Sequence, residues 1–460
     1  MLTQPTAPDP RTEAITLIRL AIPLVIGQVL LFSTNLVDTL LAGHLGPLVL
    51  GAVAIGSSVW MLPLMLLQGL MFAVPAMVSH LIGAGRRHDV GALFAQSLYL
   101  VFGVGILSLL ALRGLAAPLV SLLQVEADLS GPTTDFLRAV AWGAPSLGIF
   151  MACRGLSDGL SMTKPAMWFG LLCLALLVPI GYALMYGAFG MPGLGAYGSG
   201  LAASAVTTMG ALAFSAYVVL DPAYRGIGWA ARSRWPQWAT LRALLALGLP
   251  MAMSVVMEVS LFSFASFAIA RFGAVQVAAH QIALNVAGLT FMVPLGLSAA
   301  ITVRVGDAMG AGDPWRARLA GSLGIGLSLV SQSISCAVFL LLPGAIAALY
   351  SNDPAVQAAT VALLAFAGLF QLSDGVQVAA NGALRGMKDT KIPAAITLLA
   401  YWGVGMPVGL LLAFPAGMAA RGMWIGLLAA LTVAAVLLTW RFRRSTLAAV
   451  QHGAKLAAWH

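Results

Sequence analysis

The sequence predicts an all-α integral membrane protein with about twelve transmembrane helices in two six-helix lobes related by pseudo-two-fold symmetry. Three observations support this: an apolar composition, a series of long apolar runs, and landmarks that recur at one fixed offset. Of 460 residues, 60% are hydrophobic and 8% are charged, and the mean hydropathy is +0.95. Soluble proteins carry about 25% charged residues. Short alternating strands are absent from the sequence, which argues against a β-barrel.

Apolar runs of about 20 residues mark the predicted membrane helices, because that length spans the hydrocarbon core. We count twelve of them along the chain, with the same length rule throughout. They lie roughly at 16–41, 48–75, 92–113, 135–153, 166–187, 195–220, 242–269, 275–300, 318–343, 356–381, 393–414 and 420–440.

An internal duplication divides these helices into two sets of six. Gly83 matches Gly310 and Pro23 matches Pro250 at one difference in residue number (310 − 83 = 227 and 250 − 23 = 227), which we call the repeat offset. Further landmarks keep this offset: Gly155 and Gly382, Gly159 and Gly386, Thr163 and Thr390, Lys164 and Lys391, Gly195 and Gly422. The predicted domains are an N-terminal tail, an N-lobe, an inter-lobe linker, a C-lobe and a C-terminal tail, at residues 1–14, 15–220, 221–241, 242–441 and 442–460.

An even number of helices gives both lobes the same orientation, so they are predicted to be parallel repeats about an axis along the membrane normal. Transporters of this kind place the substrate path between the halves and alternate access by rocking them. The basic residues gather in the even-numbered loops and the C-terminal tail. Since basic loops remain cytoplasmic, both termini are predicted to face the cytoplasm.

The net charge of +9 is explained by these topology signals, and no loop shows a nucleic-acid recognition motif. The N-terminal segment lacks the basic region and short apolar region of a cleaved signal, so we expect the first helix to be retained. Three isolated cysteines without CxxC spacing predict neither a disulfide framework nor a zinc site: Cys153, Cys173 and Cys336.

Three carboxylates interrupt the apolar runs and are the strongest functional signal. Asp38, Glu258 and Asp374 lie inside the predicted first, seventh and tenth helices. A charged side chain near the bilayer centre costs about 2.5 to 3.5 kcal/mol on insertion scales, so such residues line cavities where protons or cations offset the cost. None has an acidic counterpart at the repeat offset, so the lobes share a scaffold but differ chemically.

Polar side chains accompany these acids at helical spacing. They are Gln28 and Asn35 on the first helix, Ser254 on the seventh, His280, Gln281 and Asn285 on the eighth, and Gln371, Gln377 and Asn381 on the tenth. Oxygen-rich stripes suit a hard cation or a carboxylate that gains and loses a proton. The alternative for each is a hydrogen bond between packed helices, and for His280 the structural role is the more frequent one.

Motifs of chemical catalysis do not appear. The glycines of LIGAGRR and AMGAGDPW have neither a preceding strand nor the GxxxxGK[ST] spacing, and GxSxG and HExxH motifs are absent from the sequence. We therefore predict a protein that is not an enzyme and that needs no cofactor. Without an ATP-binding motif, transport is predicted to be driven by an ion gradient.

Four stretches resemble the multidrug and toxic compound extrusion (MATE) family, and most closely its bacterial NorM-like branch. They are LVDTLLAGHLG, VAAHQIALNVAGLTFMVPLGLSAAITVRVGDAMGAGD, LSDGLSMTKPAM and DGVQVAANGALRGMKDTKIP. The resemblance runs from about Arg19 to the end of the twelfth helix. It implies a cation-coupled exporter in a bacterial inner membrane, with the lobes around a central cleft.

The resemblance assigns Asp38 to proton coupling and substrate release, and Glu258 and Asp374 to the cation site, with Na⁺ as one candidate ion. Two departures modify this expectation. Leu177 and Gly181 stand where the family has fifth-helix asparagines near Asp38. Phe370 stands where relatives have a tyrosine one turn before the tenth-helix acid, which weakens the case for tight Na⁺ ligation and favours protons.

The predicted function is secondary active multidrug efflux, in which amphiphilic and often cationic compounds leave in exchange for H⁺ or Na⁺. The bilayer and small-molecule substrates are the expected partners, and we expect the protein to act as a monomer. A lipid-linked saccharide flippase is the first alternative, although its pyrophosphate substrate calls for a cationic cleft. A membrane-embedded enzyme and a channel are weaker alternatives. The sequence leaves the individual substrates and the coupling ion open.

Overall fold

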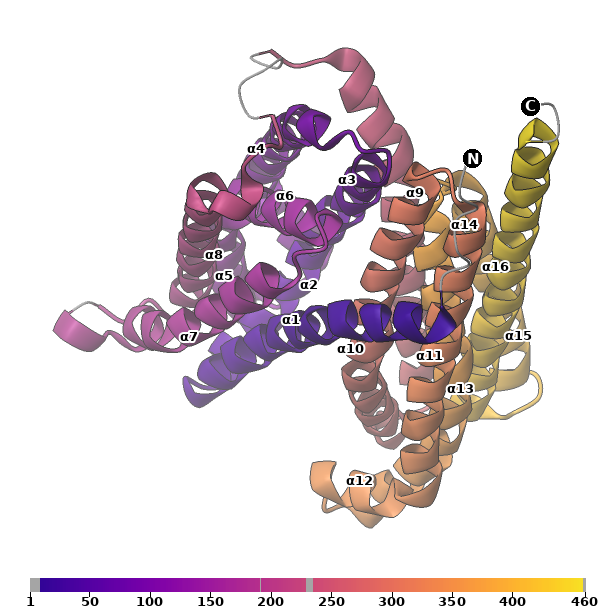
Figure 1. Cartoon of the computed structure of the whole chain (residues 1–460). Helices are drawn as coiled ribbons and strands as arrows, with labels where there is room; N and C mark the ends of the chain where they lie inside the picture. Colours follow the sequence, from indigo (N-terminus) through magenta and orange to yellow (C-terminus); the bar gives the residue numbers. More distant parts are fainter. Residues whose placement is uncertain (1–8, 191, 229–234, 458–460) are drawn as a thin grey trace. The chain divides into compact units, whose positions relative to one another are not determined.

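The computed structural model describes residues 9–190, 192–228 and 235–457, and these residues form helices, turns and loops without a strand (Figure 1). Twelve helical segments are long and apolar enough to cross a membrane, which confirms the predicted fold class. Residues 1–8 of the predicted N-terminal tail, 229–234 of the linker and 458–460 of the C-terminal tail lie outside the described residues.

Six spans come from the first half of the chain. Two of them are made of consecutive helices, α2 with α3 and α5 with α6. The helices are α1 (Pro10–His44), α2 (Pro47–Met71), α3 (Ala73–Gly83), α4 (Val90–Leu122), α5 (Ala127–Val140), α6 (Ala144–Gly159), α7 (Lys164–Tyr186) and α8 (Gly195–Leu220).

The second half also supplies six spans. The eleventh consists of two α-helices joined by a π-helical segment, η5. The elements are α9 (Trp238–Ala270), α10 (Ala274–Gly310), α11 (Pro314–Leu341), α12 (Pro343–Tyr350), α13 (Pro354–Gly386), α14 (Lys391–Leu398), η5 (Leu399–Gly405), α15 (Met406–Ala413) and α16 (Ala419–Ala457).

Local sequence explains many of these boundaries. Pro47, Pro314, Pro343 and Pro354 stand at helix starts, where a missing N–H costs nothing and the fixed φ suits the first turn. Asp313 caps α11 by accepting a hydrogen bond from the Arg316 N–H at 2.9 Å. Such a side chain satisfies one of the backbone donors that every helix start leaves unpaired.

The duplication predicted from sequence is reproduced by the helix ends. The first or last residues of several helices in the two halves differ by the repeat offset, so these helices begin or end at equivalent positions. The starts are Pro47 and Ala274, Ala127 and Pro354, and Lys164 and Lys391; the ends are Gly83 and Gly310, and Gly159 and Gly386.

The chain separates into two compact units, which we call the N-unit (residues 26–252) and the C-unit (residues 1–25 and 253–460). Each unit therefore takes the first part of one helix from the other half of the sequence. The start of α1 belongs to the C-unit, and the start of α9 belongs to the N-unit. Val25 and Ala252, the last residues of these exchanged segments, are themselves related by the repeat offset (252 − 25 = 227). The two exchanged segments therefore end at equivalent positions of the repeat.

Apolar packing holds each exchanged segment in its unit. Leu17 and Leu24 of α1 are buried in the core of the C-unit. Leu244 and Met251 of α9, their equivalents at the repeat offset, are buried in a core of the N-unit. Fully burying a leucine side chain is worth about 1.5–3 kcal/mol. Each segment therefore contributes substantially to the unit that receives it.

Two glycines permit close backbone contact at these segments. A methyl group on Gly69 of α2 would overlap the backbone of Ala252, and one on Gly296 of α10 would overlap the backbone of Val25. The two contacts are equivalent under the repeat offset. Small residues at helix interfaces let backbones approach closely inside a membrane. A glycine at equivalent positions thus allows close packing of both exchanged segments.

A charged cluster anchors the start of α1 within the C-unit. Arg304 of α10 donates to both carboxylate oxygens of Glu13, at 2.8 and 2.7 Å. Asp307 lies 3.7 Å from Arg304 and accepts a hydrogen bond of 2.8 Å from Arg316 of α11. Glu13 is 4% exposed, so this bidentate pair compensates a buried charge.

The described part of the inter-lobe linker is docked on the N-unit. Tyr224 is fully buried, and its hydroxyl is 2.8 Å from the Ser157 hydroxyl of α6. Burial raises the pKa of Tyr224 to about 12, so the phenol stays neutral in the cell. The Gly91 N–H donates to the Ile227 carbonyl at 2.6 Å, and Arg87 donates to the Ala223 carbonyl at 2.7 Å. These contacts bind the linker tightly at its N-terminal end.

Candidate functional site

The two acids of the C-unit lie on facing helices. The rings of Phe262 on α9 and Phe370 on α13 meet edge to face, with centroids 5.9 Å apart. Glu258 precedes Phe262 by one turn, and Asp374 follows Phe370 by one turn. The seventh and tenth spans run in opposite directions. Both acids therefore lie one helical turn from the ring contact, towards the same side of the membrane. The geometry therefore brings Glu258 and Asp374 to the same level of the bundle.

The acids occupy a protected interior. Asp374 is 4% exposed, and Glu258 is half-buried. The two carboxyl groups interact electrostatically with each other, and Glu258 also interacts with the guanidinium of Arg385 on α13. Arg385 in turn donates a hydrogen bond of 2.7 Å to the Ser298 hydroxyl of α10. Arg385 was not predicted as part of this site, because a basic residue near a helix end is also a topology signal.

Hydrogen-bonding capacity remains unmet beside the acids. Within the described part of the chain, Asp374 Oδ1 and both polar atoms of the Gln377 amide are buried without a hydrogen-bond partner. Buried polar atoms ordinarily find partners, because leaving one unpaired costs about 1–3 kcal/mol. Carboxylate and amide oxygens suit a proton, a water or a hard cation such as Na⁺.

The Gln371 side chain makes hydrogen bonds to two neighbouring helices. Its amide donates to the Thr290 hydroxyl at 2.7 Å and to the Ala287 carbonyl at 3.2 Å, and it accepts from Gln332 at 2.6 Å. The side chain thus links α13 to α10 and α11. This is the helix-packing alternative weighed in the sequence analysis.

The polar residues of the eighth span differ in burial. His280 is fully buried, 2.9 Å from the Ser266 hydroxyl, and packs edge to face on Trp424. Gln281 and Asn285 are more accessible, and Asn285 accepts a hydrogen bond of 3.2 Å from Tyr350 of α12. Of the three, His280 is the one that lies in the interior of the C-unit.

The remaining supporting residues lie beside the acids along their own helices. Ser254 is buried one turn before Glu258. Asn381 is half-buried, about two turns beyond Asp374. Phe370 is 3% exposed and contacts Trp424 of α16 edge to face at 5.7 Å, in addition to Phe262. An aromatic wall therefore closes the site on the side of Phe370.

In the N-unit, Asp38 is half-buried, and its Oδ1 accepts a hydrogen bond of 2.7 Å from Ser199 of α8. The sixth span thus supplies a partner for this acid. Sequence reasoning missed Ser199, because a serine beside glycines in GAYGSG reads as a packing residue. Gln28 is buried, whereas Asn35 is exposed and donates to the Leu31 carbonyl at 3.5 Å. The two polar residues chosen beside Asp38 therefore differ in exposure.

The fifth span packs apolar surface near Asp38. Leu177 is buried at 1% exposure, and Gly181 of α7 lies against Leu41 of α1. A second buried pair was not anticipated: Arg154 and Asp158 of α6 are 3.6 Å apart, with both side chains largely buried. Asp158 adds an acid to the interior of the N-unit, on a different helix from the acid selected from sequence.

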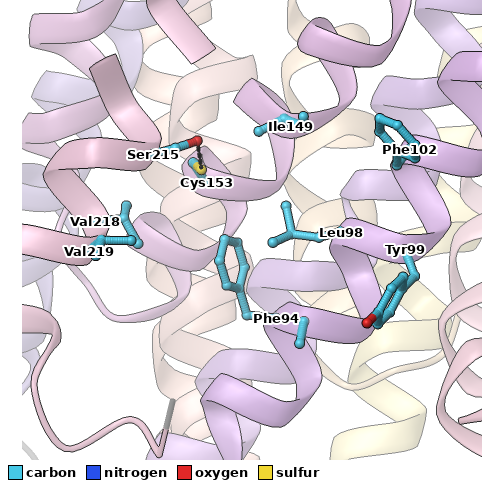
Figure 2. Close-up of a pocket in the computed structure, with 10 residues that line it drawn as sticks. Phe94, Leu98, Tyr99, Phe102, Ile149, Cys153, Ser215, Val218 and Val219 are labelled. Carbon is cyan, nitrogen blue, oxygen red and sulfur yellow. Dashed lines mark hydrogen bonds between the residues drawn. The ribbon is translucent and has the colours of Figure 1, made fainter. Parts of the chain in front are cut away.

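An apolar cavity opens in the N-unit among α4, α6 and α8 (Figure 2). Its volume is about 510 Å³. The thiol of Cys153 lies 3.6 Å from the Ser215 hydroxyl in its lining. The other labelled lining residues are almost all apolar: Phe94, Leu98, Tyr99, Phe102, Ile149, Val218 and Val219. None of the predicted site residues lines this cavity.

Comparison with known proteins gives a consistent result. The MatE family model matches twice, at residues 23–183 and 250–411. A probable multidrug resistance protein NorM of Xanthomonas campestris pv. campestris is 41% identical over 93% of each chain. The multidrug resistance protein PmpM of Pseudomonas aeruginosa is 40% identical over 95% of this chain and 92% of its own.

Solved structures show the same fold. A MATE protein in its bent conformation aligns with a TM-score of 0.89 over 97% of each chain, at 20% identity. The eukaryotic MATE transporter AtDTX14 aligns with a TM-score of 0.86 over 96% of this chain and 99% of its own. The repeated family match, which follows the duplication, and the relatives at about 40% identity establish that this membrane protein belongs to the MatE family, among its NorM-like multidrug resistance proteins.

Proposed function

We propose that the protein is a secondary active multidrug exporter that exchanges amphiphilic, often cationic compounds for H⁺ across a bacterial inner membrane. The observation that carries the proposal is the pair of acids inside the C-unit, Glu258 and Asp374, which interact electrostatically beside unmet hydrogen-bonding capacity. The names of the curated relatives support the multidrug part, and they favour it over a saccharide flippase.

The chemistry of the pair supports ion coupling. Two carboxylates in one protected site repel unless one holds a proton or a cation lies between them. The pair therefore acts as one coupled site, whose titration belongs to both groups. Phe370 offers a ring face but no oxygen, so the site has one oxygen ligand fewer for Na⁺ than a tyrosine there would give, and this favours a proton. Asp38, held by Ser199, is the coupling acid of the N-unit.

Membrane topology follows from charge. With basic residues in the even-numbered loops and the tail, both termini face the cytoplasm. Export then proceeds by alternate opening of the path between the repeats, as in other parallel-repeat transporters. The working unit is the monomer.

The decisive experiment measures substrate-induced proton release from purified protein, with and without Na⁺, and ethidium extrusion from proteoliposomes under a pH gradient. Glu258→Gln and Asp374→Asn should each remove at least nine-tenths of transport, and the double variant should lose little more. A double variant that is far worse than either single variant would disprove the coupled pair. Proton release that requires Na⁺ would identify the other coupling ion.

A further inference from the structure

The π-helical segment η5 in the eleventh span presents one tyrosine to the interior of the C-unit. Tyr401 is fully buried, and Ala400 and Gly405 of the same segment are buried too. At Gly405 a methyl group would overlap the Ala430 side chain of α16, so the two segments are in close contact. π-Helical segments inside longer helices occur frequently at functional sites.

The Tyr401 hydroxyl has no hydrogen-bond partner among the residues that the structure describes. A buried phenol usually finds a partner for its O–H, since the ring tolerates burial and the hydroxyl does not. The apolar surroundings explain why an aromatic ring is buried here, because the ring lies in the same core as Phe370 and Trp424. They do not explain why a tyrosine rather than a phenylalanine occupies this position.

The neighbours of Tyr401 supply that explanation. Its phenol interacts electrostatically with both Glu258 on α9 and Asp374 on α13. Asp374 Oδ1 is also unpaired within the described chain, so a donor without an acceptor and an acceptor without a donor share one interior. Of the other titratable side chains, Arg385 interacts with Glu258, whereas His280 is bonded to Ser266 and packs on Trp424. Against Gly405 of η5, α16 contributes Gly426 and Ala430, neither of which carries a charge.

We propose that Tyr401 is a positioning residue of the coupling site, whose hydroxyl donates a hydrogen bond, directly or through one water, to the Glu258–Asp374 pair when the pair has released its proton. The inference rests on the proposed ion coupling and adds a third element to it. A donor to the ionised form stabilises that form. Tyr401 therefore sets the pH at which the pair releases its proton.

The test is Tyr401→Phe, measured as substrate-induced proton release over a pH series. Hydrogen bonds to charged groups are strong enough that losing one should raise the midpoint by about one pH unit. Trp402→Phe is the matched control, because Trp402 lies next on η5 and its indole nitrogen is also buried without a partner in the described residues. It should leave the midpoint unchanged.

Moving the hydroxyl from position 401 to position 370 distinguishes a hydrogen-bonding role of Tyr401 from a packing role. Phe370→Tyr places a phenol one turn before Asp374, so Tyr401→Phe combined with Phe370→Tyr should lower the midpoint towards the parent value. Fluorotyrosine at position 401, a stronger donor, should move it downward. An unshifted midpoint in a folded Tyr401→Phe protein overturns the inference. Proton release that survives Asp374→Asn overturns the ion-coupling proposal itself.

Discussion

At the scale of single residues, the hydroxyl of Ser199 distinguishes the N-unit acid from its C-unit counterparts. Asp38 Oδ1 accepts a hydrogen bond from Ser199, whereas Asp374 Oδ1 has no hydrogen-bond partner among the described residues. Asp38→Asn should abolish substrate-dependent proton exchange while the protein still reaches the membrane in normal amounts. Ser199→Ala should reduce exchange about tenfold, which corresponds to one hydrogen bond to a charged group. Ser204 lies on the same helix as Ser199 and donates to the Ala139 and Val140 carbonyls of α5, so it provides the control position.

The second residue-scale prediction concerns the amide pair of Gln332 and Gln371. Gln371→Leu leaves Gln332 and Thr290 without their partner, so the free energy of unfolding should fall by about 1–3 kcal/mol. Adding Gln332→Leu should restore part of that loss, because both ends of the bond are then apolar. Thermal unfolding in detergent measures the effect. Transport per folded molecule should remain normal; loss of transport would mean that the pair serves coupling.

At the scale of helices, the contacts of Gly69 and Gly296 are predicted to be equivalent. Gly69→Val and Gly296→Val should each destabilise the protein by about 1–3 kcal/mol or more, because each adds atoms where backbones touch. Gly103→Val and Gly326→Val are matched controls, since a methyl at those helix positions meets nothing within 4 Å. Their unfolding temperatures should stay within a few degrees of the parent.

The Glu13–Arg304 pair gives a second helix-scale prediction. Arg304→Met leaves Glu13 buried without its partner and should cost about 3–5 kcal/mol of unfolding free energy. Glu13→Leu combined with Arg304→Met should recover most of it. Glu13→Leu alone should be milder, because Asp307 stays near Arg304. A double variant as unstable as Arg304→Met would contradict the buried-pair account.

Helix identity was predictable, whereas helix partners were not. The lengths of the apolar runs predicted twelve spans, and the repeat offset predicted that helices of the two halves begin and end at equivalent positions. Both signals can be read directly from the sequence. Asp374 was predictable as an interior acid, since an isolated charge in an apolar run is costly. Ser199 and Tyr401 were not, because their roles depend on side chains brought together by folding. The exposure of Asn35 was not predictable either, because helical spacing relates it to Asp38 without specifying which face of the helix is covered.

At the scale of the whole molecule, the exchange of helix segments predicts how the halves depend on each other. A fragment ending in the linker lacks residues 238–252, which complete the N-unit, and the C-terminal fragment lacks residues 1–25. Each fragment expressed alone should be degraded, and co-expression should restore folded protein. Protease cleavage at a site inserted in the linker of folded protein should leave both pieces in one peak on gel filtration. Separation of the pieces would show that the exchanged segments contribute little.

The exchange also sets an order of events during synthesis. Val25 leaves the ribosome long before Gly296, the glycine that receives it, because the two are far apart in residue number (296 − 25 = 271). At a synthesis rate of about 5–20 residues per second, the delay is roughly 15–55 s. During that interval the start of the first helix lacks the contacts that it makes in the folded protein, and its acid Glu13 lacks the ion pair with Arg304. A chain whose synthesis stops before Gly296 therefore keeps the start of its first helix without its neighbours and Glu13 without its partner.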